Sequence, residues 1–172
     1  MTLRETHTAS RCLSSLAPIG EGCRAGEHNR DFTNSSQNLL SMPFSYVVHK
    51  EYRLIVSIGS DCVTFSEIKT RQDQTKADPD FNPEFNQIVD LRGVTHFDMS
   101  SEQAKALARR MIFATTSKRA FVAVSPAIFG VARMWEIFTE MSDHPSEIRV
   151  FYDLPAALTW LDLENLPSKL FT

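Results

Sequence analysis

The stretch Ala120–Met141, AFVAVSPAIFGVARMWEIFTEM, carries the clearest fold signal in the chain. Its first five residues, Ala120–Val124, are an uninterrupted apolar run of the type found in strands that are buried on both faces. Ser125-Pro126 follows as a helix cap and a first-turn proline, a position where the missing proline N–H is harmless. A helix to about Met141 comes next. A buried strand that leads through a cap into a helix is the repeating unit of a parallel α/β sheet.

The same alternation extends toward the N-terminus. Ser45–His49 and Arg53–Ile58 are β-branched and aromatic runs separated by a short polar stretch, which predicts an antiparallel hairpin. A helix is expected over Thr64–Lys76, with Thr64 as its cap and Glu67 as the capping-box partner. The proline-rich stretch after it must end this helix, because each proline disfavours the helical region for the residue before it.

The remaining elements complete the pattern. Gln87–Leu91 is predicted as a short buried strand, and Ser100 and Gln103 form a second capping box at the start of a helix. Glu147–Tyr152 is a further strand, followed by an Asp153 cap and a short closing helix. The order of a hairpin followed by alternating helices and strands predicts an α/β fold. Its sheet is mixed and largely parallel, opened by the antiparallel hairpin and connected by crossover helices.

Composition divides the chain into three parts. Residues 1–41 are rich in Ser, Thr and Asn and lack periodicity, so they are predicted to be a disordered leader. Met42-Pro43 stands directly before the first periodic segment, and we hypothesise that translation can start at Met42 and that the leader is an upstream extension. Residues 42–161 form the predicted domain, and residues 162–172 are expected to be a loose tail.

Composition also excludes several classes of partner. The 18 Lys+Arg against 21 Asp+Glu leave a formal charge of -3, so we expect no nucleic-acid binding. No apolar run approaches the roughly 18 residues of a membrane span, and the layout of a signal peptide is absent. The odd count of 3 cysteines, Cys12, Cys23 and Cys62, is typical of a reducing compartment. These observations predict a cytoplasmic protein.

Several motifs carry a family resemblance. VDLRGVTHFDMSS, Val89–Ser101, resembles the strand, loop and helix start of STAS domains, the anti-sigma-factor antagonist fold. The wider run from Met42 to Leu161 resembles the SpoIIAA-like (STAS/SEC14-type) group of small bacterial proteins, most of them uncharacterised. The motifs that carry this wider resemblance are PDFNPEFNQIVDLR (Pro79–Arg92), Ala132-Arg133-Met134 and VFYDLPAALTWL (Val150–Leu161).

This resemblance implies a regulatory site at the start of the second helix. In STAS antagonists a serine at this point is phosphorylated by a partner kinase, and the dephosphorylated domain binds that partner. The chain departs from the pattern at Met99, where a small polar residue is usual, and at Glu102, where a glycine usually follows. The alternative is that Ser100 is only a helix cap. The regulatory or partner-binding candidates are Arg92, His96, Asp98, Ser100 and Ser101.

A catalytic alternative uses some of the same residues. Ligands gather beyond the carboxyl ends of parallel strands, which brings His96 and Asp98 toward one rim. With a serine they offer a hydrolytic arrangement, although the chain has no G-x-S-x-G elbow. The same two side chains lack a third metal ligand at suitable spacing, and the nucleotide-binding glycine motifs are absent. We therefore assign no catalytic residue, metal or cofactor.

The helix that ends near Met141 has only a narrow polar stripe, at Arg133, Glu136 and Glu140. Three interpretations stay open for its apolar residues Phe129, Met134 and Ile137: cover by neighbouring helices, self-association as a homodimer, or an apolar ligand pocket between helix and sheet, as in SEC14-like proteins.

We expect a non-catalytic regulatory or binding module that acts through protein contact. The alternative is a binder of a small apolar or lipid-like ligand, and a hydrolase is a distant third.

Overall fold

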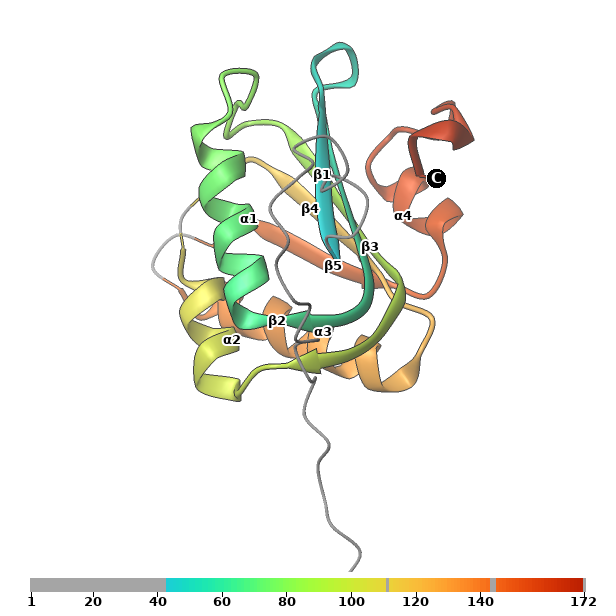
Figure 1. Ribbon diagram of the computed structural model, residues 1–172. Coiled ribbons are helices and arrows are strands. Elements are labelled where there is room, and N and C mark those ends of the chain that lie inside the picture. The colour runs from blue at the N-terminus through green and yellow to red at the C-terminus, as the bar shows by residue number, and fades with distance from the viewer. Residues whose placement is uncertain (1–42, 111, 143–144, 172) are drawn as a thin grey trace, which may run out of the picture.

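The computed structural model describes residues 43–110, 112–142 and 145–171, and their centre is a twisted sheet (Figure 1). Within these residues the sheet has five strands in the order β1-β2-β3-β4-β5. β1 runs antiparallel to β2, and the other neighbours are parallel. The predicted mixed sheet, opened by a hairpin and otherwise parallel, is therefore confirmed. The strands are β1 (Phe44–His49), β2 (Leu54–Thr64), β3 (Asn86–Asp98), β4 (Lys118–Val122) and β5 (Glu147–Phe151).

The helices cover both faces of the sheet unequally (Figure 1). Crossovers of one hand that all step in the same direction place their helices on the same face. The crossover helices α1 (Phe65–Ala77), α2 (Ser101–Ala108) and α3 (Pro126–Glu140) accordingly share one face. α4 (Leu154–Trp160) follows the last strand and packs on the opposite face. Two short 3₁₀ helices, η1 (Lys50–Tyr52) and η2 (Ser168–Phe171), complete the elements.

Each face of the sheet has its own core. Side chains such as Val89, Phe121 and Trp135 form the core under α1, α2 and α3. Leu54 and Ile88 belong to the core under α4. The two sets interleave along the strands because successive side chains of a strand point to opposite faces.

Local capping signals account for most of the helix starts. The backbone N–H of Glu67 donates to the Thr64 hydroxyl, and the carboxylate of Glu67 accepts from the Thr64 N–H at 2.8 Å. Ser100 with Gln103 repeats this capping box, and Asp153 caps α4. Ser125 is the exception, because it stands at the predicted position but its side chain makes no capping hydrogen bond.

β2 and β3 are longer than the sequence predicts. They were expected to end at Ile58 and Leu91 but continue to Thr64 and Asp98, with register shifts along the way. Gly59 lies at the first shift, and a Cβ added there would lie 2.8 Å from Cγ2 of Val94. Gly59 therefore marks a close approach between paired strands and not the end of β2.

The predicted loose tail at 162–172 is wrong for the residues that the structure describes. Leu163, Leu166, Leu170 and Phe171 pack against the core under α4, and Phe171 is 8% exposed. α4 is too short to cover its face of the sheet, so apolar tail residues complete the cover. The predicted leader, residues 1–41, and the proposed start at Met42 lie outside the described residues.

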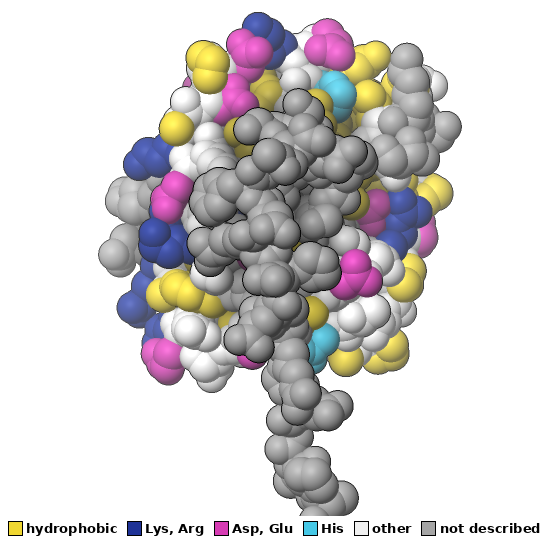
Figure 2. Space-filling view, in the orientation of Figure 1, with side chains coloured by type: hydrophobic (Ala, Val, Ile, Leu, Met, Phe, Trp, Pro, Cys, Tyr) yellow, Lys and Arg dark blue, Asp and Glu magenta, His cyan; other side chains and the backbone are white. Residues whose placement is uncertain are grey.

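Charge on the surface is mixed rather than segregated. On the face drawn in Figure 2, Lys and Arg side chains alternate with Asp and Glu along the left-hand edge, where α1 and α2 lie in Figure 1. None of the helices in the described ranges combines the length and the apolar character of a membrane-spanning segment.

Candidate functional site

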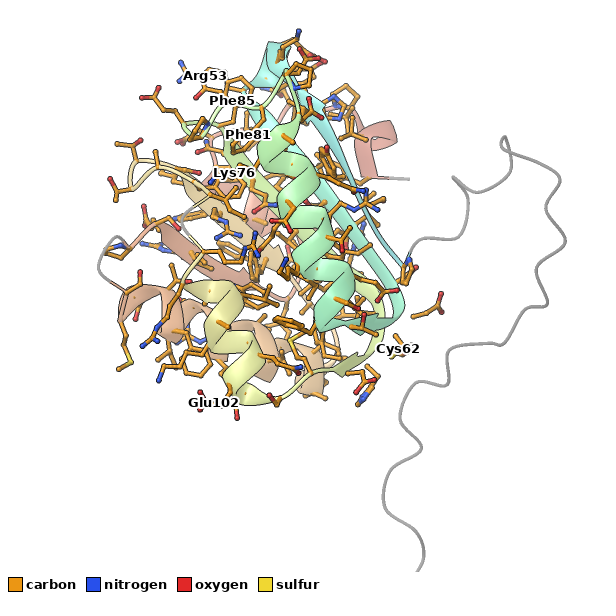
Figure 3. All side chains as sticks on the ribbon, turned by 60° about the vertical axis from the view of Figure 1, so that its left-hand side comes forward. Arg53, Cys62, Lys76, Phe81, Phe85 and Glu102 are labelled. Atoms are coloured by element: carbon orange, nitrogen blue, oxygen red, sulfur yellow. The ribbon has the colours of Figure 1, made fainter. Side chains whose placement is uncertain are left out.

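The residues that the resemblance points to lie together at one end of the molecule, marked by Cys62 and Glu102 in Figure 3. Arg92, His96 and Asp98 are on the extended part of β3, not on a loop, and Ser100 and Ser101 begin α2. All five are exposed. The hydroxyl of Ser100 accepts a hydrogen bond from the Gln103 N–H, so this serine acts as the α2 cap.

Arg92 has a structural partner. Its Nη2 and Nε donate to the carboxylate of Asp90 at 2.7 and 2.9 Å, and the Asp90 side chain is 5% exposed. These hydrogen bonds raise the pKa of Arg92. The guanidinium therefore neutralises a buried carboxylate at the end of the β3–β4 pairing.

The hydrolytic arrangement is not assembled in the described part of the chain. His96 makes no hydrogen bond or ion pair there with Asp98 or with a serine. A search of the same residues finds no group of three His, Cys, Asp or Glu side chains placed to hold a metal ion. The strand order also runs without reversal, so these strands have no topological switch point of the kind where α/β enzymes bind their ligands.

The three apolar candidates on α3 have different surroundings. Phe129 stacks on Tyr152 with ring centroids 4.0 Å apart, Met134 is half-buried, and Ile137 is 46% exposed. Glu136, which the helical pattern places in the polar stripe, is instead buried and accepts a hydrogen bond from Arg133 at 2.5 Å. An arginine three residues before it on the helix neutralises this carboxylate, so it can face inward.

A cavity of about 50 Å³ lies between α1, α3 and the sheet. Its lining extends from Gln87 and Arg119, near the amino ends of β3 and β4, to Phe97, near the carboxyl end of β3. Most of its lining is apolar. Ile68 belongs to α1, Phe121 to β4, and Val131, Ala132 and Trp135 to α3. An apolar pocket between this helix and the sheet was one of the sequence interpretations, but the three residues named for it, Phe129, Met134 and Ile137, do not line this cavity.

A polar row crosses the sheet beneath the cavity. Nε2 of Gln87 donates to the Ser57 hydroxyl at 2.9 Å, and Nε of Arg119 donates to Oε1 of Gln87 at 2.9 Å. The Arg119 guanidinium also lies 4.6 Å from the centroid of the Phe113 ring and 5.6 Å from that of Phe121. Three strands thus supply a row of neutral and cationic groups to an otherwise apolar space.

Arg119 is the exceptional member of this row. It is 9% exposed, and burial lowers its pKa to about 10, so it is charged at neutral pH. Among the described residues, no carboxylate pairs with it, and its Nη1 and Nη2 groups have no hydrogen-bond partner. Two further buried atoms of cavity-lining residues have no partner in this part of the chain, Nε1 of Trp135 and Oε1 of Gln72.

A weak sequence signal for this site was present. Gln87 and Arg119 are each the second residue of a strand and directly precede an apolar run, Ile88-Val89 and Ala120–Val122, at a position where a buried polar side chain needs a specific reason. Their proximity depends on strand pairing, because 32 residues separate them in the chain and they become register partners only in the sheet.

Comparison with known proteins adds a fold and no function. No family model matches the chain, and no curated protein matches it significantly. Among solved structures, the chain is similar to an uncharacterized protein from the DUF3478 family with a SpoIIAA-like fold from Shewanella loihica PV-4. The identity is 14%, the TM-score is 0.49, and the match covers 69% of this chain and 93% of that one. The fold named for that protein is the same as the family group that this sequence resembles.

Proposed function

We propose that this chain is a non-catalytic binding module that holds a small ligand in the cavity between α1, α3 and the sheet. The observation that carries this proposal is Arg119, a buried side chain that is hydrogen-bonded through Nε to Gln87 and pairs with no carboxylate among the described residues. A buried charge is strongly disfavoured unless it is paired and hydrogen-bonded. A bound ligand would supply the missing partner.

The surroundings of Arg119 support the same proposal. Ligand sites are concave, mostly apolar, and carry a few converging polar groups. The cavity has that composition, with apolar side chains from three elements around the Arg119 guanidinium, the Trp135 indole N–H and the Gln72 amide. This is the ligand-binding alternative of the sequence analysis, located on the inner face of α3.

The test reduces the volume of the cavity by substitution and measures whether a small molecule still co-purifies with the protein. Ala132 is 2% exposed and lines the cavity on α3, so Ala132→Leu places extra atoms in the space. Ala127→Leu, at an exposed position of the same helix, is the matched control. Protein purified from its own cells is denatured and extracted, and the extract is examined by mass spectrometry. We expect a small molecule near one equivalent with the natural chain and the control, and its loss with Ala132→Leu.

Circular dichroism checks that each variant is folded, and Ala132→Val provides a milder filling if the leucine variant is not. Extracts free of any small molecule over repeated preparations, together with unchanged thermal stability on adding cell extract, would contradict the proposal. A molecule retained equally by all variants would place it elsewhere on the chain, with the same consequence.

A second candidate function is contact with a protein partner or a second copy of the chain. Large apolar side chains are exposed on and near α3: Val124 at 54%, Ile137 at 46%, Met141 at 78% and Tyr152 at 57%. Exposed apolar side chains that gather in one region are typical of interaction surfaces. Sedimentation velocity of Ile137→Asp against the natural chain tests self-association, and loss of a co-purified partner on Ser100→Asp tests regulation at the α2 start.

A further inference from the structure

We propose that the group bound beside Arg119 is the carboxylate of a small organic monoanion, an inference that rests on the proposed ligand-binding function. A carboxylate group is common to free short-chain acids and to the heads of longer apolar acids. The charge of the cavity, the geometry of its donors and its volume each support a carboxylate.

Charge selects an anion. The charged residues that line the cavity are Arg119 and Arg71, and no acidic side chain is among its lining residues. Arg119 is the more deeply buried, and its neighbours are a neutral amide and two aromatic rings. A cation in a low-dielectric space attracts an anion more strongly than it would in water. A neutral ligand would leave this positive charge uncompensated.

The geometry of the donors selects a planar group with two oxygens. Gln87 already occupies Nε of Arg119, which leaves Nη1 and Nη2 as the available pair of donors. Paired N–H groups of a guanidinium match the two oxygens of a carboxylate in a bidentate arrangement. The indole N–H of Trp135 lines the same cavity and provides one more donor to a ligand oxygen.

The volume limits the ligand. A single water molecule needs roughly 10–15 Å³ of such free space, so a cavity of about 50 Å³ has room for a carboxylate and a short apolar stem. The rest of the wall suits hydrocarbon, with Ile68, Val89 and Leu91 close to the polar row. A phosphate ester would bring more oxygens and more charge than these donors satisfy.

Isothermal titration calorimetry on the full chain tests the inference. The probes are propionate, octanoate, propionamide and inorganic phosphate, titrated in a chloride buffer free of organic acids. We expect a carboxylate to bind at least about tenfold more tightly than propionamide, since a charge-assisted bidentate pair is worth that much or more. Tighter binding of propionate identifies a free short-chain acid, and tighter binding of octanoate identifies the head of a longer acid.

Arginine variants locate the effect. Arg119→Met removes the charge and keeps an apolar stem, and it should abolish the preference for the carboxylate. Arg119→Lys keeps the positive charge but lacks the paired N–H donors of a guanidinium, so it should retain only part of the preference for the carboxylate. Arg149→Met, on the neighbouring strand β5, is the matched control, because Arg149 does not line the cavity, and it should bind as the natural chain does.

Each contrary result has a distinct meaning. Propionamide or phosphate binding as tightly as the carboxylates overturns the inference and leaves the proposed function standing. No binding of any probe, while a molecule is still extracted from the natural chain, also overturns the inference alone. No binding together with empty extracts overturns both.

Discussion

Arg119→Met is the substitution whose outcome separates a ligand site from an ordinary core most clearly. Removing one partner of a buried ion pair usually costs about 3–5 kcal/mol, because the other charge is left uncompensated. Arg119 has no acidic partner among the described residues, so its removal leaves no carboxylate there without a counter-charge. We therefore expect the free energy of unfolding of the ligand-free protein to change by no more than about 1 kcal/mol.

The magnitude follows from opposing terms of similar size. Burial lowers the pKa of Arg119 to about 10, and a fall of this size from its ordinary value corresponds to about 3 kcal/mol against the charged form. Methionine relieves that cost. It also loses the hydrogen bond to Gln87, worth about 1.5–3 kcal/mol for a charged donor, and the contacts with two aromatic rings, worth about 0.5–1 kcal/mol. The losses and the relief nearly cancel.

Urea unfolding of the ligand-free natural chain and the variant, followed by circular dichroism, measures the difference. A loss above about 2 kcal/mol would falsify the reasoning, because it would show that the buried charge is compensated within the folded protein. Below pH 10 the guanidinium is protonated in both the folded and the unfolded state, so the difference should be constant between about pH 6 and pH 9. As pH rises above 10, the unfolded chain binds more protons than the folded one, so the natural protein gains stability relative to the variant.

Other substitutions test the fold. Gly59→Ala should cost about 1–3 kcal/mol in urea unfolding, because its methyl group would crowd a neighbouring strand, whereas Gly130→Ala should add about 0.5–1 kcal/mol on an open helix face. Equal effects of the two would contradict the close approach of β2 and β3. Ser100→Ala should cost about 1 kcal/mol through loss of the α2 cap, and Ser101→Ala almost nothing. Phe171→Ala should lower stability by about 3 kcal/mol, and an unchanged midpoint would mean that the C-terminal segment does not pack.

Short-range signals predicted the elements well. Thr64 with Glu67 and Ser100 with Gln103 each settle a helix start within four residues, so no distant contact is needed to recognise them. The alternation of strands and helices likewise predicted the sheet and its antiparallel opening. Local reasoning failed where a residue's partner is remote. The continuation of β2 past Gly59 was not predicted, because Val94 on the paired strand is distant from Gly59 in the sequence.

The candidate site shows the same division. The exposed residues around Ser100 were found from a motif that is contiguous in the chain, and the structure leaves their regulatory role as a prediction. The residues that line the cavity were not predicted, because its walls come from α1, α3 and four strands. A single arginine in an apolar strand does not reveal whether a carboxylate will face it.

From its amino-acid sequence alone, this chain is specified as a largely parallel α/β domain with capped helices, since capping, periodicity and turn chemistry act over a few residues. Strand pairing determined the rest. It brought Gln87 beside Arg119, extended β2 and β3 past their glycines, and drew the C-terminal segment onto the second core. A buried guanidinium that no carboxylate faces is a property of its surroundings, and those surroundings exist only once strands distant in the chain lie side by side.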